Sequence, residues 1–237
     1  MEERNWRMAG RGLAVVALGV VLGAMLQARM RTQSASYPAM APIDQYGMAR
    51  GGEIELARSA APDSISRDAE ILVLGPKGFE TAVKGKNGFV CLVQRSWAAG
   101  VDDPEFWNPK LRAPACFNAN AARTYLPHII KKTEWALAGA SKAQIADKIK
   151  AAFDKKELTP PDLGAMCYMM SKHGYLSDRD GHWHPHLMFF VPPTDPQTWG
   201  AGESGSPLLG FKDEAERTTV FLLPVGKWSD GTPAGMI

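Results

Sequence analysis

Short apolar runs, each bounded by turn residues, mark the middle of the chain as strand-forming. Such runs cover residues 69–74, 79–84 and 89–95. Glycine-containing turns at 75–78 and 85–88 separate them, and turns at this spacing are typical of antiparallel neighbours. The pattern predicts a three-stranded antiparallel meander.

Helical periodicity replaces the strand pattern between residues 120 and 156. Apolar residues recur on one helical face up to Leu137, after an asparagine at 118 or 120 that can cap the first turn. Ser141 with Gln144 three residues later forms a capping box for the next helix. The segment therefore predicts consecutive helices that bury one face.

Strand-like runs return at 166–173, 182–191 and 218–225. The segments 97–118 and 192–207 show no period and are predicted to be long loops. Strands, then helices, then strands within one compact length predict an α+β domain. Its sheet is expected to be mostly antiparallel, with the helices at about 120–156 covering one face.

The first 28 residues have the features of a signal peptide. Basic residues precede an uncharged apolar stretch at 12–25, which is shorter than the roughly 20 residues of a spanning helix. Small residues around Ala28 predict cleavage there and a periplasmic or secreted protein. The alternative is that the segment stays uncleaved and anchors the protein in the inner membrane. No other part of the chain is expected to contact a membrane. Residues 29–68 are predicted to be a flexible tether with a short helix, and residues 69–237 a single α+β domain.

Charge and cysteine content narrow the function classes. The chain has 27 basic and 25 acidic residues, interspersed rather than clustered, so a nucleic-acid partner is not expected. Three cysteines are too few for a disulfide scaffold. Cys91 and Cys167 lie in apolar runs and are expected to be buried, whereas Cys116 is expected in an accessible loop. The sequence leaves open whether two of the three cysteines form a disulfide and the third is a free thiol.

A histidine cluster carries the main chemical hypothesis. His182, His184 and His186 alternate along a predicted strand, so they share one face. In a hairpin with 166–173, His173 would lie opposite His184, Ser171 opposite His186 and Met169 opposite Met188. These four histidines with nearby methionine sulfur would suit zinc or copper. The competing interpretation is that the imidazoles bond to loop backbone.

Three stretches resemble a group of uncharacterised exported bacterial proteins. They are Gly-Phe-Val-Cys-Leu-Val at 88–93, Phe-Trp-Asn-Pro-Lys at 106–110 and Gly-His-Trp-His-Pro-His-Leu-Met-Phe-Phe at 181–190. The resemblance implies one continuous domain in a bacterial envelope. It implies no activity, cofactor or catalytic residue.

The sequence thus favours an exported module that binds a transition metal or a small molecule. One alternative is a metal-dependent hydrolase or oxidoreductase in which Glu105, Asp178 or Asp180 acts as acid or base. Another is a structural envelope module without metal.

Overall fold

The computed structural model describes residues 37–178, 181 and 183–235. Within them, eight strands form one sheet in the order β2-β1-β3-β4-β5-β6-β8-β7, and all neighbouring pairs are antiparallel except the parallel pair β1 and β3. The expected α+β class with a mostly antiparallel sheet is confirmed. The strands are β1 (Glu70–Gly75), β2 (Gly78–Val83), β3 (Val90–Gln94), β4 (Ala113–Phe117), β5 (Ala165–Met169), β6 (His186–Val191), β7 (Leu209–Asp213) and β8 (Thr218–Pro224).

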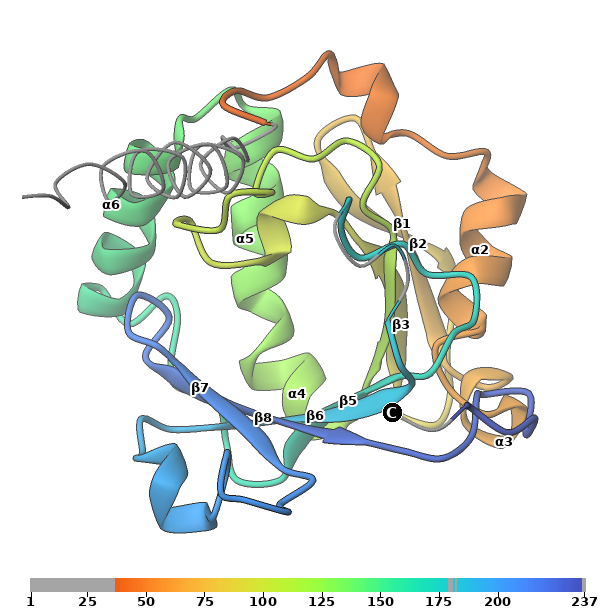
Figure 1. The fold of residues 1–237 in the computed structure, drawn as a ribbon. Helices are drawn as coiled ribbons and strands as arrows, with labels where there is room; N and C mark the ends of the chain where they lie inside the picture. The colour runs from red at the N-terminus through yellow and green to blue at the C-terminus, as the bar shows by residue number, and fades with distance from the viewer. Residues whose placement is uncertain (1–36, 179–180, 182, 236–237) are drawn as a thin grey trace, which may run out of the picture. The chain divides into compact units, whose positions relative to one another are not determined.

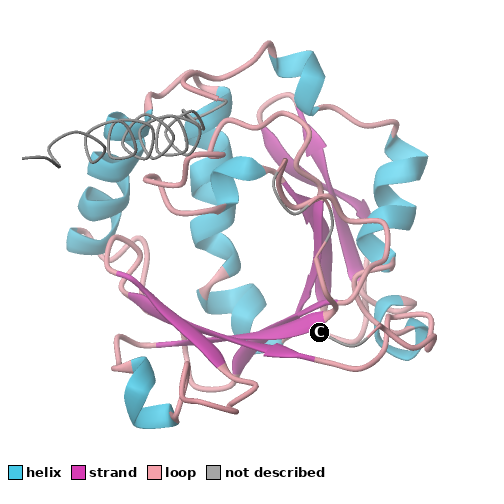
Figure 2. Cartoon of the chain, viewed as in Figure 1, coloured by secondary structure: helices cyan, strands magenta, loops and turns pink. Residues whose placement is uncertain are grey.

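Helices lie on both sides of this sheet, which curves strongly (Figures 1 and 2). On its concave side lie α4 (Ala119–Thr124) and α5 (Leu126–Leu137), with α6 (Lys142–Asp154) beyond α5. On the opposite side, α2 (Arg50–Arg58) and α3 (Asp63–Ser66) lie near β1 and β3. Three short 3-10 helices complete the fold: η1 (Ile43–Tyr46), η2 (Ser96–Ala98) and η3 (Pro196–Trp199).

The alternation of strand residues divides the core between these two sides. Leu92 and Phe117 face the concave side and pack in one cluster with Ile129 of α5. Their neighbours Cys91 and Cys116 face the other side and pack with alanines of the α2 region. Because both faces are covered, the central strands are apolar on both sides.

The helical part follows the local signals in the sequence. The Asn118 side chain accepts a hydrogen bond from the Ala121 backbone at the start of α4. Ser141 and Gln144 make both bonds of the capping box of α6. Ile149, on the predicted apolar face, is buried.

The predicted meander is wrong in its third strand. The β1–β2 hairpin is antiparallel, but β3 lies on the other side of β1 and runs parallel to it. The connection passes the start of β1 at Gly85, where an added Cβ would lie 2.2 Å from the Glu70 nitrogen. Only a residue without a side chain permits so close a crossing.

Two strands form where the sequence predicts loops or assigns nothing. Within 97–118, β4 is buried at all five positions between β3 and β5. Its Pro114 is tolerated because β5 pairs only with Cys116 and Phe117, so β4 has a neighbour on one side at that point. The edge strand β7 was also missed, since its largely exposed residues follow a Gly/Ser/Pro segment.

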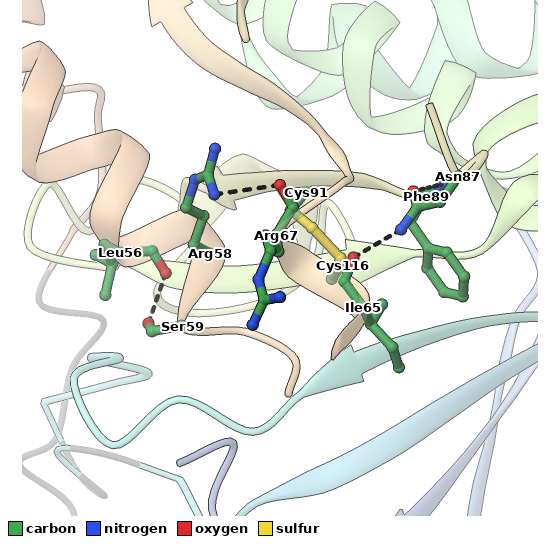
Figure 3. Close-up of a disulfide and its surroundings, with 9 residues drawn as sticks. All are labelled: Leu56, Arg58, Ser59, Ile65, Arg67, Asn87, Phe89, Cys91 and Cys116. Carbon is green, nitrogen blue, oxygen red and sulfur yellow. Dashed lines mark hydrogen bonds between the residues drawn. A yellow bond between two sulfur atoms is a disulfide. The ribbon is translucent and has the colours of Figure 1, made fainter. Parts of the chain in front are cut away.

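Cys91 and Cys116 are direct partners across β3 and β4 and form a disulfide (Figure 3). Both are fully buried, which contradicts the expectation that Cys116 is accessible. Cys167 is free and buried. The disulfide ties together two of the three strands over which α2 packs.

Residues 37–68 pack onto the sheet and its loops. Tyr46 of η1 is fully buried and donates a hydrogen bond to the Trp107 carbonyl at 2.8 Å. No helix in the described part of the chain is both long and apolar enough to cross a bilayer. The predicted signal segment, residues 1–28, lies outside the described residues.

Candidate functional site

Of the strand predicted at 182–191, the part that forms β6 begins only at His186. His184 precedes β6, His173 is exposed in the turn after β5, and His182 lies outside the described residues. Met169 is the direct partner of His186, so the register differs by two residues from the prediction that placed Ser171 there.

β5 also ends at Met169, four residues before the end of the predicted strand. The Met170 backbone N–H donates to the Ala60 carbonyl, and its own carbonyl accepts from the Ser229 N–H. The Ser171 hydroxyl is 2.6 Å from the Ser59 hydroxyl. These contacts draw the chain away from β6 and toward the α2 region, a long-range effect that strand alternation does not encode.

His186 has one ring nitrogen engaged and one free. Its Nδ1–H donates to the His184 carbonyl at 2.7 Å, because a carbonyl can only accept. The ring of Trp183 meets it edge-on with centroids 5.7 Å apart. Burial lowers the pKa of His186, which favours the neutral ring. Nε2 therefore presents a lone pair, with no hydrogen-bond partner among the described residues.

The other predicted ligands do not gather around His186. The His184 ring lies 6.3 Å from the Trp228 ring, and His173 is exposed. Among the described residues, no group of three or more histidine, cysteine or acidic side chains is arranged to hold a metal ion.

The proposed acid–base carboxylates are engaged in loop contacts. Asp178 accepts hydrogen bonds from Tyr175, Tyr37 and Lys110, which lower its pKa to about 2. Glu105 accepts from the Asn108 side chain at 2.8 Å and from the Asp178 backbone. Both residues thereby hold the 105–110 loop against the 175–178 turn. Asp180 lies outside the described residues.

A cavity of about 830 Å³ lies beside His186, and nothing in the sequence pattern predicts it. The 95–104 loop, Tyr125, and residues of β5, β6, β7 and β8 line it. Much of its wall is apolar, formed by Met169, Leu176, Met188, Phe190, Val220 and Leu222. Its volume lies in the range of about 300–1,000 Å³ typical of small-molecule sites.

Several polar groups of the residues that line the cavity have no hydrogen-bond partner among the described residues. The Ser96 hydroxyl and the Trp183 indole N–H are buried without a hydrogen bond to any described residue. His186 adds its free Nε2. The Tyr125 ring stacks on Phe190 with centroids 3.7 Å apart, and its hydroxyl bonds to nothing in the described chain. Burial raises the pKa of this phenol well above its usual value, with Glu216 adding to the effect, so it remains a donor.

Buried groups without partners need an explanation, because nearly all buried polar groups in proteins are hydrogen-bonded. Here two of them, the Ser96 hydroxyl and the Trp183 N–H, belong to residues that line one cavity, together with His186 and Tyr125. An apolar cavity with a few polar groups is the arrangement found in small-molecule sites. A single clue was present in the sequence, the Trp183–His186 segment, but it indicates the cavity only once β5 to β8 are assembled.

The fold and this site define a class: an α+β domain with a curved sheet and a cavity of small-molecule size on its concave side. No protein-family model, curated protein or solved structure matches the chain.

Proposed function

We propose that this protein is an exported binding domain that takes a compact, largely apolar small molecule into the concave cavity. One observation carries the proposal. Ser96, Trp183 and His186 all line one largely apolar cavity of about 830 Å³, and each has a polar group without a partner among the described residues. A ligand with a polar group would satisfy such positions while its body fills the apolar part.

Two features support the exported setting. The basic and apolar segments within residues 1–28 have the form of a signal peptide. The Cys91–Cys116 disulfide belongs to an oxidising compartment, since such bonds are rare in the cytosol. Intact-mass measurement of protein extracted from the cell envelope tests cleavage after Ala28. A full-length mass in the membrane fraction would instead identify an uncleaved anchor.

The binding proposal is tested with Nile red, a neutral apolar dye whose fluorescence rises when it leaves water. We expect saturable binding of one dye per chain. Met188→Trp, which fills the cavity from β6, is expected to abolish it. Leu187→Trp is the matched control, because residue 187 lies on the opposite face of the same strand. Absence of saturable binding, or equal binding by the folded Met188→Trp protein, would overturn the proposal.

A transition metal is the second candidate ligand, and one observation favours it. His186 is held by a backbone carbonyl at Nδ1 with Nε2 free, as in metal-ligating histidines. Met169 lies directly opposite and supplies a soft thioether. His182, His184 and His173 would complete a zinc or copper site in this proposal.

The metal alternative has its own measurement. The mature protein is offered stoichiometric zinc or copper, desalted, and analysed for bound metal beside the His184→Ala and His128→Ala variants. Metal retained by the wild type and by His128→Ala, and lost by His184→Ala, would support it. Equal retention by the wild type and His184→Ala would exclude this ligand set.

A further inference from the structure

One end of the cavity is acidic. Asp102 and Asp103 reach it from the loop after η2, and Asp213 and Glu214 from the end of β7. Within the described chain, these four carboxylates form no salt bridge. Two basic residues also line the cavity, but Arg95 is paired with buried Glu53 at 2.9 Å, and Lys212 is exposed. The buried Lys132 ammonium also acts on Asp213, but it is already paired with Glu216, so carboxylates outnumber cations at this end.

Two of the carboxylates lie on either side of one glycine. A Cβ built on Gly100 would be 2.8 Å from the Asp102 Oδ1 and 4.0 Å from the Asp213 Oδ2. Burial raises the pKa of Asp213 and the charges of Glu216 and Asp102 add to the rise, which the Glu216 backbone N–H and the Lys132 charge only partly offset. The carboxylates therefore repel one another in a partly desolvated place, which a cation would relieve.

A separate observation comes from Ser96, in the same loop. Its side chain is 1% exposed, and its hydroxyl has no partner among the described residues. A hydroxyl can accept a hydrogen bond as well as donate one. Ser96 thus places a buried polar group without a described partner beside the acidic loop.

We propose that the cavity selects ligands that carry an ammonium group on an apolar body. This inference rests on the proposed function and specifies its ligand class. The ammonium group would lie at the acidic end, bonded to Asp213 and Asp102, and the apolar body would contact Met169, Met188 and Leu222. The ammonium would keep its charge, because carboxylate partners replace the water it loses. An anionic ligand of the same shape would be repelled.

Three indoles that differ only in their end group test the selection: tryptamine, the alcohol tryptophol and indole-3-acetate. Their affinities are measured at low ionic strength by displacement of Nile red and by calorimetry. We expect tryptamine to bind about tenfold or more tightly than tryptophol, the size of effect that a charge-assisted hydrogen bond produces. Indole-3-acetate is expected to be the weakest of the three.

The Asp213→Asn variant removes one charge but keeps an Oδ1 that can accept from the Glu216 N–H, 2.9 Å away in the native protein. We expect the preference for tryptamine over tryptophol to fall severalfold while tryptophol affinity is unchanged. Asp147→Asn removes the same charge from an exposed position on α6 and should keep the full preference.

The outcomes separate the two proposals. Nile red binding with equal displacement by tryptamine and tryptophol would overturn the amine inference and leave the binding domain standing. An unchanged preference in Asp213→Asn would likewise overturn the assigned position of the ammonium group. Failure of all four probes to bind would overturn both proposals together.

Discussion

Lys132 and Glu216 form an ion pair in the interior, with side chains 1% and 3% exposed. Lys132 also donates to the carbonyls of Ala98 and Ala99, which line the cavity. The second carboxylate oxygen of Glu216 is 3.3 Å from the His128 ring. Lys132 thereby uses all three of its donors, and the pair ties α5 to the cavity loop and to the turn before β8.

Removing the lysine is expected to destabilise the fold strongly. Burial alone would raise the pKa of Glu216, but Lys132 and His128 together hold that pKa below its usual value. Lys132→Met would leave a buried, unpaired carboxylate at a cost of about 3–5 kcal/mol. Urea unfolding at pH 7.5 measures this free energy.

The control is Lys131→Met, whose lysine is 41% exposed and pairs with Glu134 on the surface. Its cost should stay below about 1 kcal/mol. Because acid neutralises Glu216, the deficit of Lys132→Met should shrink as the pH falls. Equal free energies of unfolding for the two variants would show that the buried pair does not hold the fold together.

The disulfide is expected to contribute measurably to stability. Cys91 and Cys116 are 25 residues apart in the chain, and a loop of this length gives about 3.5 kcal/mol by restricting the unfolded state. Unfolding of the native protein with and without a thiol reductant should differ by that amount. The Cys91→Ser/Cys116→Ser double variant should be insensitive to the reductant. Reductant-sensitive unfolding of the double variant would assign the effect to another site.

His186 should make stability depend on pH in the mildly acidic range. Since burial lowers its folded-state pKa, the unfolded chain takes up a proton first as the pH falls. Its contribution is complete above about pH 6.5 and is lost between that value and the lower folded-state pKa, at no more than about 1.4 kcal/mol per pH unit.

His186→Asn tests this assignment, because the amide N–H can still donate to the His184 carbonyl. Urea unfolding of both proteins at pH 7.5, 6.5 and 5.5 should show a smaller decrease for the variant. The other histidines are common to both proteins and cancel in the comparison. Parallel pH profiles would show that His186 is not the group responsible.

The sequence predicts the helices well because their signals are local. A capping box, such as Ser141 with Gln144, acts within one turn, and the α6 stripe with Ile149 needs only a face to bury. Strand runs were also visible for β1, β2 and β3. What could not be predicted is how those strands are arranged, since the parallel β1–β3 pair depends on the crossing at Gly85.

The candidate site was harder to predict than the fold, because it too depends on how the strands are arranged. The histidine alternation correctly drew attention to the segment that contains His186. Its partner is Met169, two residues from the predicted register, and contacts of Met170 with Ala60 and Ser229 end β5 early. The cavity combines residues from segments more than 100 positions apart, such as Ser96 and Leu222, so no local pattern could reveal it.

Gly174 sets the position of the Trp183 ring in the cavity wall. A Cβ at Gly174 would lie 2.7 Å from the indole Cζ2 and 3.0 Å from Cη2, closer than side-chain atoms can approach. Trp183 is 5% exposed and packs edge-on against His186, so the ring cannot simply turn into solvent. Gly174→Ala should therefore displace the indole, at a cost of about 1–3 kcal/mol for overpacking.

Because the displaced ring lines the cavity, Gly174→Ala should also weaken Nile red binding severalfold and shift the tryptophan emission. Gly226→Ala is the control, since nothing lies within 4 Å of its added Cβ, and it should preserve dye binding. Phenylalanine lacks the outer indole atoms that meet residue 174, so adding Trp183→Phe to Gly174→Ala should cost less than the two separate effects combined. Strict additivity, with dye affinity unchanged in Gly174→Ala, would mean that contact between residues 174 and 183 does not shape the binding site.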